Sequence, residues 1–259
     1  MSEYNDLLVE RDGATLIITI NRPENGNKFS HQTCLELVDA LQKLRLDRTL
    51  QTGVLTGAGD KFFCIGGEHD PMTHLDQSQV LPVVDVYQAI DTIPKPVIAA
   101  VNGFAVGGGN VLNTVCDLSV AAENAVFRQV GPMVGSFDAG YGTWYLEDTI
   151  GRKKAKEMWF LNDKYSAEEA LRWGIINKVV PQGEAVDEAV KIAHRINQRS
   201  PLAIGSLKAA FSARHNGISG QARMAHDQQL TFYLATKEAH ELSGSFSERR
   251  EPDSEVFWT

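Results

Sequence analysis

The sequence is poor in cysteine and has no long hydrophobic run. Its 259 residues include three cysteines, Cys34, Cys64 and Cys116, which are too few and too scattered for a disulfide framework or a zinc-binding spacing. No apolar run reaches the roughly 18 to 20 residues that a membrane-spanning helix needs. The first residues have neither the basic nor the apolar stretch of a secretory signal. We therefore expect a cytoplasmic protein without a membrane partner.

Basic residues are also in deficit. The chain has 25 Lys and Arg residues against 33 Asp and Glu residues, a net charge of −8. Nucleic-acid binding needs a dense basic surface, so this balance argues against DNA or RNA as the main partner. It still permits a local basic site for a small phosphorylated ligand. With 43% hydrophobic and 22% charged residues, the composition is that of an ordinary globular protein.

Short apolar segments alternate with helical segments through the first half of the chain. Asp12-Gly13 separates two apolar segments in the pattern of a tight hairpin turn. The expected buried strands are 53–57, 97–101 and 118–122, and the expected helices are 30–44, 83–93 and 109–116. Nearly all-apolar strands that alternate with helices are typical of a parallel sheet covered on both faces. The sequence thus predicts an α/β fold.

The C-terminal third is predicted to be helical. Ser166 and Glu169 form a capping-box pattern that opens one helix. The other expected helices are 152–161, 185–197, 202–213 and 221–242. Because no low-complexity linker separates these segments, we expect one α/β core, residues 1–199, with a helical appendage, residues 200–259.

Two glycine-rich segments follow predicted strands. Gly66 and Gly67 lie in the first, and Gly107, Gly108 and Gly109 open a predicted helix in the second. Glycine lets backbone N–H groups approach a ligand, and a helix N-terminus adds positive potential. Two such segments can direct two N–H groups at one oxygen atom, which is an oxyanion hole, or they can simply be tight turns. The second segment lacks the GxGxxG spacing of a dinucleotide site.

Five short motifs occur in order along almost the whole chain. They are Asn21-Arg22-Pro23, Cys64-Ile65-Gly66-Gly67, the segment 95–103, Gly107-Gly108-Gly109 and Cys116-Asp117-Leu118. In type and spacing they resemble the signatures of the crotonase (enoyl-CoA hydratase/isomerase) superfamily. The resemblance implies a spiral of ββα repeats. It also implies that the helical region 200–259 mediates trimerisation, with trimers often paired into hexamers.

The resemblance further implies an acyl-CoA substrate, with CoA as part of that substrate rather than a separate cofactor. The backbone N–H groups of Gly67 and Gly108 would hold the thioester oxygen and stabilise an enolate. For Lys28, a contact with CoA phosphate and an ordinary solvated side chain are both open. The other residues that the resemblance places at the substrate are Gly66, Gly107 and Asn27.

The chain lacks the two glutamates that hydratases of this superfamily use as acid and base. The corresponding positions are Val111 and Gly131, and neither residue can transfer a proton. Simple hydration of an enoyl-CoA is therefore disfavoured. Isomerisation is disfavoured too. Isomerases of the superfamily usually carry their catalytic carboxylate at the second of these positions, which is Gly131 here.

A different polar stretch, residues 129–142, stands in this region. It resembles two groups of the superfamily: 2-ketocyclohexanecarboxyl-CoA hydrolases, which open a β-keto ring with water, and 1,4-dihydroxy-2-naphthoyl-CoA synthases, which close a ring by a Dieckmann-type condensation. By this resemblance Asp138 transfers protons, Ser136 is its hydrogen-bonding partner and Tyr233 is a phenol donor to the substrate. The match continues through 153–161 and the tail 249–253, where Arg249 is a candidate CoA contact.

Gln129, Gly131 and Trp159 match a polar pocket that binds bicarbonate in some of these synthases. There the anion stands in for the missing carboxylate. Taken alone, a Ser-x-Asp pattern is usually a turn or a helix cap, and Tyr233 or Trp159 at helical spacing is usually core. The catalytic interpretation of these residues therefore depends on the resemblance.

The segment from Glu68 to His74 contains two histidines and two carboxylates, which are metal-ligand types. We favour a solvated loop, since the superfamily carries an active-site flap here, and we expect no metal. His69 follows Gly67 by two residues and is a candidate substrate contact.

We therefore expect a homo-oligomeric enzyme that opens the ring of an alicyclic β-ketoacyl-CoA by hydrolysis. Ring closure of the naphthoyl-CoA synthase type is the alternative enzyme activity. A third hypothesis is a non-catalytic homologue that binds RNA or acts as a scaffold. The acidic net charge argues against RNA, and the presence of the whole 136–142 segment argues against a scaffold.

Overall fold

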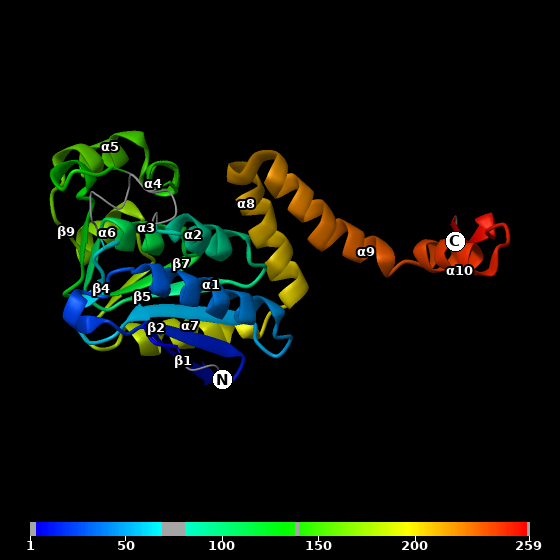
Figure 1. The fold of residues 1–259 in the computed structure, drawn as a ribbon, viewed down its shortest axis with the longest axis horizontal. Coiled ribbons are helices and arrows are strands. Elements are labelled where there is room, and N and C mark those ends of the chain that lie inside the picture. The colour runs from blue at the N-terminus through cyan, green and yellow to red at the C-terminus, as the bar shows by residue number, and fades with distance from the viewer. Residues whose placement is uncertain (1–3, 69–80, 138–139, 258–259) are drawn as a thin grey trace. The chain divides into compact units, whose positions relative to one another are not determined.

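The computed structural model describes residues 4–68, 81–137 and 140–257. The chain divides into two compact units, Met1–Gly205 and Ser206–Thr259, a boundary a few residues beyond the one that we expected. The sheets belong to the first unit (Figure 1). Within the described ranges, no helix is both long enough and apolar enough to cross a membrane.

A six-stranded sheet forms the centre of the first unit, in the order β1-β2-β3-β5-β7-β10. Its strands are β1 (Leu7–Asp12), β2 (Thr15–Ile20), β3 (Thr52–Gly57), β5 (Val97–Val101), β7 (Leu118–Ala122) and β10 (Lys178–Val180). The first two strands are antiparallel and the remaining neighbours are parallel. The predicted hairpin at Asp12-Gly13 and the predicted parallel sheet are confirmed.

A second, four-stranded sheet has the order β4-β6-β8-β9. Its strands are β4 (Phe62–Cys64), β6 (Phe104–Val106), β8 (Val126–Arg128) and β9 (Tyr165–Ser166). The successive pairs β3–β4, β5–β6 and β7–β8 each place one strand in each sheet, and helices α2 and α3 follow the first two pairs. This arrangement confirms the predicted α/β spiral of ββα repeats.

Helices cover both faces of the six-stranded sheet, with α7 on one face and α1, α2 and α3 on the other (Figure 1). In β5, Val97, Ala99 and Val101 belong to the core under α1–α3, whereas Ile98 and Ala100 belong to the core under α7. This follows from the two-residue alternation of a strand. The helices of this unit are α1 (His31–Leu46), α2 (Val83–Thr92), α3 (Gly108–Val115), α4 (Gly142–Ile150), α5 (Arg152–Leu161), α6 (Ala167–Trp173) and α7 (Ala185–Asn197).

Two predicted helix starts are confirmed. The Ser30 side chain accepts the Thr33 N–H at 3.0 Å at the start of α1. At the start of α6, the Ser166 hydroxyl accepts the Glu169 N–H at 3.3 Å, and the Glu169 carboxylate accepts the Ser166 N–H at 2.9 Å. Both arrangements satisfy N–H groups that have no acceptor within the helix.

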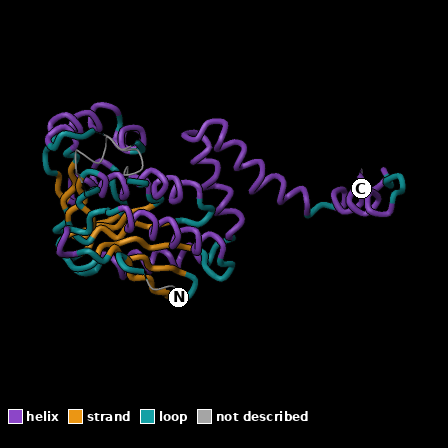
Figure 2. The backbone as a smooth tube through the Cα atoms, in the orientation of Figure 1, coloured by secondary structure: helices purple, strands orange, loops and turns teal. Residues whose placement is uncertain are grey.

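The described residues of the second unit are mainly helical (Figure 2). Its elements are the end of α8 (Pro201–Met224), a π-helical segment (Ala225–Leu230), α9 (Thr231–Leu234), α10 (Lys237–Glu248) and a final turn (Ser254–Phe257). The prediction of one helix over 221–242 is wrong, because Thr236 starts a new helix by accepting the Ala239 N–H at 3.2 Å. After α10, the Arg250 guanidinium and the Asp253 N–H both bond to Glu241.

Candidate active site

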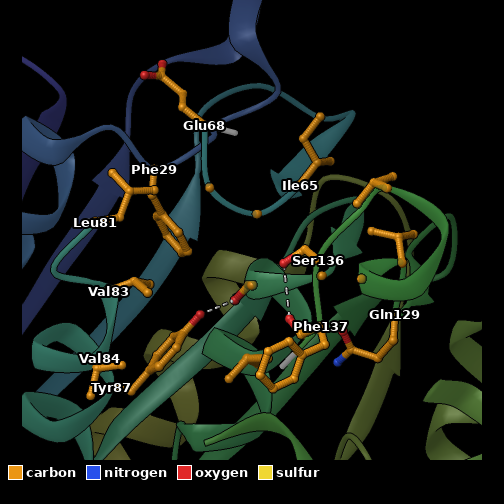
Figure 3. A pocket seen from close by; sticks show the side chains of 18 of the residues that line it. Phe29, Ile65, Glu68, Leu81, Val83, Val84, Tyr87, Gln129, Ser136 and Phe137 are labelled. Carbon is orange, nitrogen blue, oxygen red and sulfur yellow. Dashed lines mark hydrogen bonds between the residues drawn. The ribbon is translucent and has the colours of Figure 1, made fainter. Parts of the chain in front are cut away.

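A cavity of about 390 Å³ opens where β4, β6 and β8 end in the first unit. This volume is within the usual range for a small-molecule site. Phe29 and Leu81 line one side, and Gln129, Ser136 and Phe137 line the other (Figure 3). Further apolar lining residues include Ile65, Val83, Val84, Val130 and Val134. The cavity therefore suits an apolar group that meets a small number of polar atoms.

The N–H of Gly67 is directed away from the neighbouring segment at Phe29. Phe29 donates its N–H to the Gly66 carbonyl at 2.9 Å and accepts the Glu68 N–H at 2.8 Å. In a parallel bridge of this kind, the residue between the two bonds turns its own N–H to the opposite side. Gly67 lines the cavity. Its N–H has no acceptor among the described residues.

The N–H of Gly108 is equally available. Gly108 is the first residue of α3, and the N–H groups of a first helical turn have no acceptor within the helix. The two glycine segments touch, because a Cβ atom built on Gly66 would lie 3.3 Å from the Gly108 nitrogen. Gly67 and Gly108 thus supply two neighbouring donors at one wall of the cavity, with the positive end of the α3 dipole behind them.

The backbone at these segments requires glycine. Gly66 and Gly107 have φ values of 96° and 56°, which side chains rarely allow. At Gly109 the limit is space, since a Cβ atom there would lie 1.9 Å from the carbonyl oxygen of Cys64. Only glycine therefore lets α3 start this close to the end of β4.

The Tyr87 hydroxyl bonds to the same glycine segment. It donates to the Gly108 carbonyl at 3.0 Å (Figure 3), and the Tyr87 side chain is buried against the cavity. Our sequence reasoning did not single out Tyr87. A tyrosine in the apolar stripe of the predicted helix 83–93 could have indicated a role for this residue, because a buried tyrosine hydroxyl usually has a hydrogen-bond partner.

Unpartnered polar groups stand at the wall formed by the end of β8 and by α5. Gln129 is fully buried, and neither its amide oxygen nor its amide nitrogen has a partner among the described residues. The indole nitrogen of the buried Trp159 is likewise without a partner in that part of the chain. Both residues line the cavity together with Gly131 and Ser136. Buried polar groups are normally hydrogen-bonded, so this wall is suited to a polar ligand group or water.

The two positions that carry glutamate in hydratases also line this cavity. Val111 lies on α3 and Gly131 follows β8. The carboxylate among the described lining residues is Glu68, which is ion-paired with Arg22 at 2.6 Å. In Figure 3 the Glu68 carboxylate points away from Tyr87 and Ser136.

The side chain of Asn27, a predicted CoA contact, is hydrogen-bonded within the protein. Its side chain is fully buried. The amide oxygen accepts the Arg22 N–H at 3.0 Å, and the amide nitrogen donates to the carbonyls of Ala58 and Phe62 at 3.1 and 2.7 Å. These bonds occupy the amide. The Lys28 carbonyl accepts from Arg22 at 2.8 Å, and Lys28 stays a candidate phosphate contact.

Four further predicted site residues lie in the second unit or outside the described residues. Tyr233, on α9, and Arg249, in the left-handed conformation after α10, belong to the second unit. Asp138 and His69 lie outside the described residues. Over the described ranges, no cluster of three or more His, Cys, Asp or Glu side chains is arranged to hold a metal ion.

Comparison with known families identifies the chain. Residues 10–256 match the model of a family described as enoyl-CoA hydratase/isomerase. The chain belongs to this family. It is thus a crotonase-superfamily enzyme that acts on CoA thioesters.

Solved structures of the family resemble the chain over almost its entire length. DspI from Pseudomonas aeruginosa is 27% identical, with 98% of each chain covered and a TM-score of 0.79. An enoyl-CoA hydratase from Bacillus anthracis is 28% identical, covers 96% of this chain and 98% of its own, and has a TM-score of 0.77. A carnitinyl-CoA hydratase from Mycobacterium avium is 31% identical, covers 96% and 97%, and has a TM-score of 0.73.

Proposed function

We propose that this family member opens the ring of an alicyclic β-ketoacyl-CoA by hydrolysis, in the manner of a 2-ketocyclohexanecarboxyl-CoA hydrolase. One observation carries the proposal. The cavity has free backbone donors at Gly67 and Gly108 and unpartnered side chains at Gln129 and Trp159. At positions 111 and 131, however, it has no group that could add water across a double bond as a hydratase does.

The reaction is a retro-Dieckmann cleavage. A base takes a proton from water, and the resulting hydroxide adds to the ring ketone. The bond between the ketone carbon and the α-carbon then breaks, and its electron pair passes into the thioester as an enolate. A proton returned to the α-carbon gives a chain with a CoA thioester at one end and a carboxylic acid at the other.

Each step has a candidate group in this chain. Gly67 and Gly108 stabilise the enolate oxygen, and Gln129 and Trp159 offer donors for the ketone oxygen. For proton transfer we propose Asp138, on the sequence resemblance, with Ser136 two residues before it at the cavity wall. Tyr233 and Arg249 are proposed as substrate and CoA contacts from the C-terminal region.

The unpartnered donors also favour a second candidate, ring closure of the naphthoyl-CoA synthase type. In that reaction a bicarbonate ion would occupy the pocket of Gln129, Gly131 and Trp159. Two buried N–H donors without partners suit an anion of this kind. Activity that depends on added bicarbonate would distinguish this candidate.

We further propose that the protein is a cytoplasmic homo-trimer or a dimer of trimers assembled through residues 206–259. The assembly is supported by the large apolar side chains that this unit exposes, among them Leu207, Phe211, Ile218, Phe232 and Phe246. Contiguous exposed apolar groups commonly mark interfaces. Sedimentation analysis of the full chain tests the assembly, and a monomer at micromolar concentration would contradict it.

The activity test offers three substrates to the purified enzyme. These are 2-ketocyclohexanecarboxyl-CoA in ¹⁸O-labelled water, a short enoyl-CoA, and the succinylbenzoyl-CoA precursor with and without bicarbonate. From the ring substrate we expect a chain with a CoA thioester at one end and a free carboxylate at the other, with ¹⁸O in the free carboxylate. Faster hydration of the enoyl-CoA without ring opening would refute the proposal.

An Asp138→Asn variant tests the proton-transfer assignment. We expect kcat to fall about 100-fold or more, the usual scale of general acid–base catalysis, with little change in substrate binding. The matched control is Asp60→Asn, which makes the same change at an exposed carboxylate that does not line the cavity. A near-normal rate for Asp138→Asn would remove this residue from the mechanism.

A further inference from the structure

The two peptide groups on either side of Gly108 are restrained by backbone contacts, because Gly107, Gly108 and Gly109 have no side chains. The Gly107 carbonyl accepts the Val111 N–H at 3.0 Å, which restrains the peptide before Gly108. The peptide after Gly108 can be restrained through the Gly108 carbonyl. Glycine loses the most conformational freedom on folding, and a donor shifted by about 1 Å loses much of its catalytic effect. A group that restrains Gly108 would therefore affect the oxyanion hole directly.

Tyr87 makes such a contact. Its hydroxyl donates to the Gly108 carbonyl at 3.0 Å, and a Cβ atom built on Gly108 would lie 3.1 Å from the same hydroxyl. The contact is thus a hydrogen bond, and the same hydroxyl leaves little room for a side chain at position 108. A hydrogen bond to the carbonyl restrains the peptide on one side of Gly108 while the N–H on its other side stays free for a ligand.

The Tyr87 ring is itself held firmly. It is fully buried, and its centroid lies 6.0 Å from that of Tyr141, which in turn lies 5.1 Å from Tyr145. The buried Asp91, one turn after Tyr87 on α2, is close enough to add to the effect of burial and raise the pKa of both Tyr141 and Tyr145. The rings of Tyr141 and Tyr145 thus form a row that packs against the ring of Tyr87.

We infer that Tyr87 is a positioning residue that holds Gly108 so that its N–H stays directed at the thioester oxygen. The inference depends on the proposed role of Gly67 and Gly108 as oxyanion donors. It does not depend on which ring substrate the enzyme cleaves.

The first test measures polarisation of the thioester without turnover. Cyclohexanecarboxyl-CoA labelled with ¹³C at the thioester carbonyl is bound to the enzyme, and the carbonyl stretch is recorded by infrared difference spectroscopy. Wild-type enzyme should shift this stretch to lower frequency, and Tyr87→Phe should reduce the shift or broaden the band. If the wild-type enzyme gives no shift, the oxyanion assignment fails; if Tyr87→Phe gives the wild-type shift, the inference about Tyr87 fails.

The second test separates kcat from KM. For Tyr87→Phe we expect kcat to fall roughly tenfold, less than the 10²- to 10³-fold loss on removing an oxyanion donor outright, with KM changed less than about twofold. A variant with 4-aminophenylalanine at position 87 keeps an N–H donor and should recover part of kcat. A rise in KM with unchanged kcat would overturn the inference, since the hydroxyl would then act by binding substrate.

Tyr165→Phe is the matched control. Tyr165 is also buried, its ring packs on Trp173 with centroids 4.7 Å apart, and its hydroxyl has no hydrogen-bond partner among the described residues. It does not line the cavity. The same chemical change should therefore leave kcat and the carbonyl shift unaltered, and equal losses in both variants would contradict a specific role for Tyr87. Melting temperatures of both variants establish that they are folded.

Discussion

Replacement of Gly109 by alanine is the sharpest structural test of the oxyanion hole. The new Cβ atom would lie 1.9 Å from the carbonyl oxygen of Cys64 and 2.6 Å from its carbonyl carbon. These atoms are backbone at the end of β4, in a parallel sheet with β6, and cannot rotate away. To lengthen the distance between the Cβ atom and the Cys64 oxygen from 1.9 Å to an ordinary contact of 3.4 Å, α3 and β4 must separate by about 1.5 Å.

This displacement acts directly on the two proposed donors. Gly108 precedes Gly109 at the start of α3, and Gly67 follows β4 closely, so the movement separates their N–H groups. A misplacement of about 1 Å can cost about 100-fold in rate, and loss of one donor costs about 10²- to 10³-fold. We therefore expect kcat of Gly109→Ala to fall at least about 100-fold. Overpacking should also lower the free energy of unfolding by about 1 to 3 kcal/mol.

The assay combines turnover, acyl-CoA binding by calorimetry and urea unfolding. Gly244→Ala is the control, because a Cβ atom at Gly244 in α10 would meet nothing within 4 Å. It should retain activity and gain up to about 1 kcal/mol in the free energy of unfolding. A folded Gly109→Ala variant with wild-type kcat would show that the spacing of α3 and β4 does not determine the donor geometry, and would refute the reasoning.

Three further predictions follow from electrostatics and capping. Burial raises the pKa of Cys34 and Cys64 to about 12, so iodoacetamide should leave both unmodified at pH 8 until the protein unfolds. Because unfolded thiols ionise near pH 8.5, the free energy of unfolding should also fall between about pH 9 and 12; rapid alkylation of the native protein would contradict this. A hydrogen bond from Arg250 lowers the pKa of Glu241 to about 2. In an NMR titration, Arg250→Gln should return the pKa of Glu241 towards 4.5. An unchanged pKa in this variant would exclude the hydrogen bond in solution. The stability that this pair contributes should be lost as the pH falls from about 4.5 to 2. Ser166→Ala removes a helix cap and should lower the free energy of unfolding by about 1 kcal/mol; an unchanged urea midpoint would contradict the cap.

The long elements of the fold could be predicted from the sequence because each carries a clear period. The α7 range 185–197 and the α5 range 152–161 match their predicted limits, since apolar residues recur at helical spacing through both. The strands β4, β6 and β8 were not predicted. Each has three residues, which is too short for an alternating pattern to be recognised.

The break at Thr236 shows a different limit of sequence reasoning. Threonine occurs within helices as well as at their starts, and the apolar pattern continues on both sides of it. The extended backbone of Thr236, with φ −83° and ψ 155°, and the hydrogen bond from the Ala239 N–H to its side chain show that a new helix begins there. A side-chain hydrogen bond of this kind competes with the helix but hardly changes the spacing of apolar residues in the sequence.

At the candidate site, sequence motifs indicated two glycines that line the cavity but not Tyr87, which bonds to one of them. Gly67 and Gly108 were found because their glycine-rich motifs are specific. Tyr87 was not, because its partner lies 21 residues further along the chain, and a phenol within an apolar stripe resembles ordinary core. Asn27 stays a predicted CoA contact, and nothing in the sequence indicated that its side-chain amide bonds to Arg22, Ala58 and Phe62.

The polar groups of the cavity also restrict the kind of chemistry that it can perform. Proton-transferring side chains are scarce among its described lining residues, where the Glu68 carboxylate is paired with Arg22, whereas N–H donors are plentiful. Donors stabilise oxygen atoms that gain negative charge, and a retro-Dieckmann cleavage creates two of them, one on the thioester and one on the former ketone. Addition of water to an enoyl-CoA creates only the first, so that water rather than a charged substrate oxygen would have to bind the buried donors of Gln129 and Trp159. The surplus of donors over carboxylates among the described lining residues is the reason why we propose C–C bond cleavage at this site.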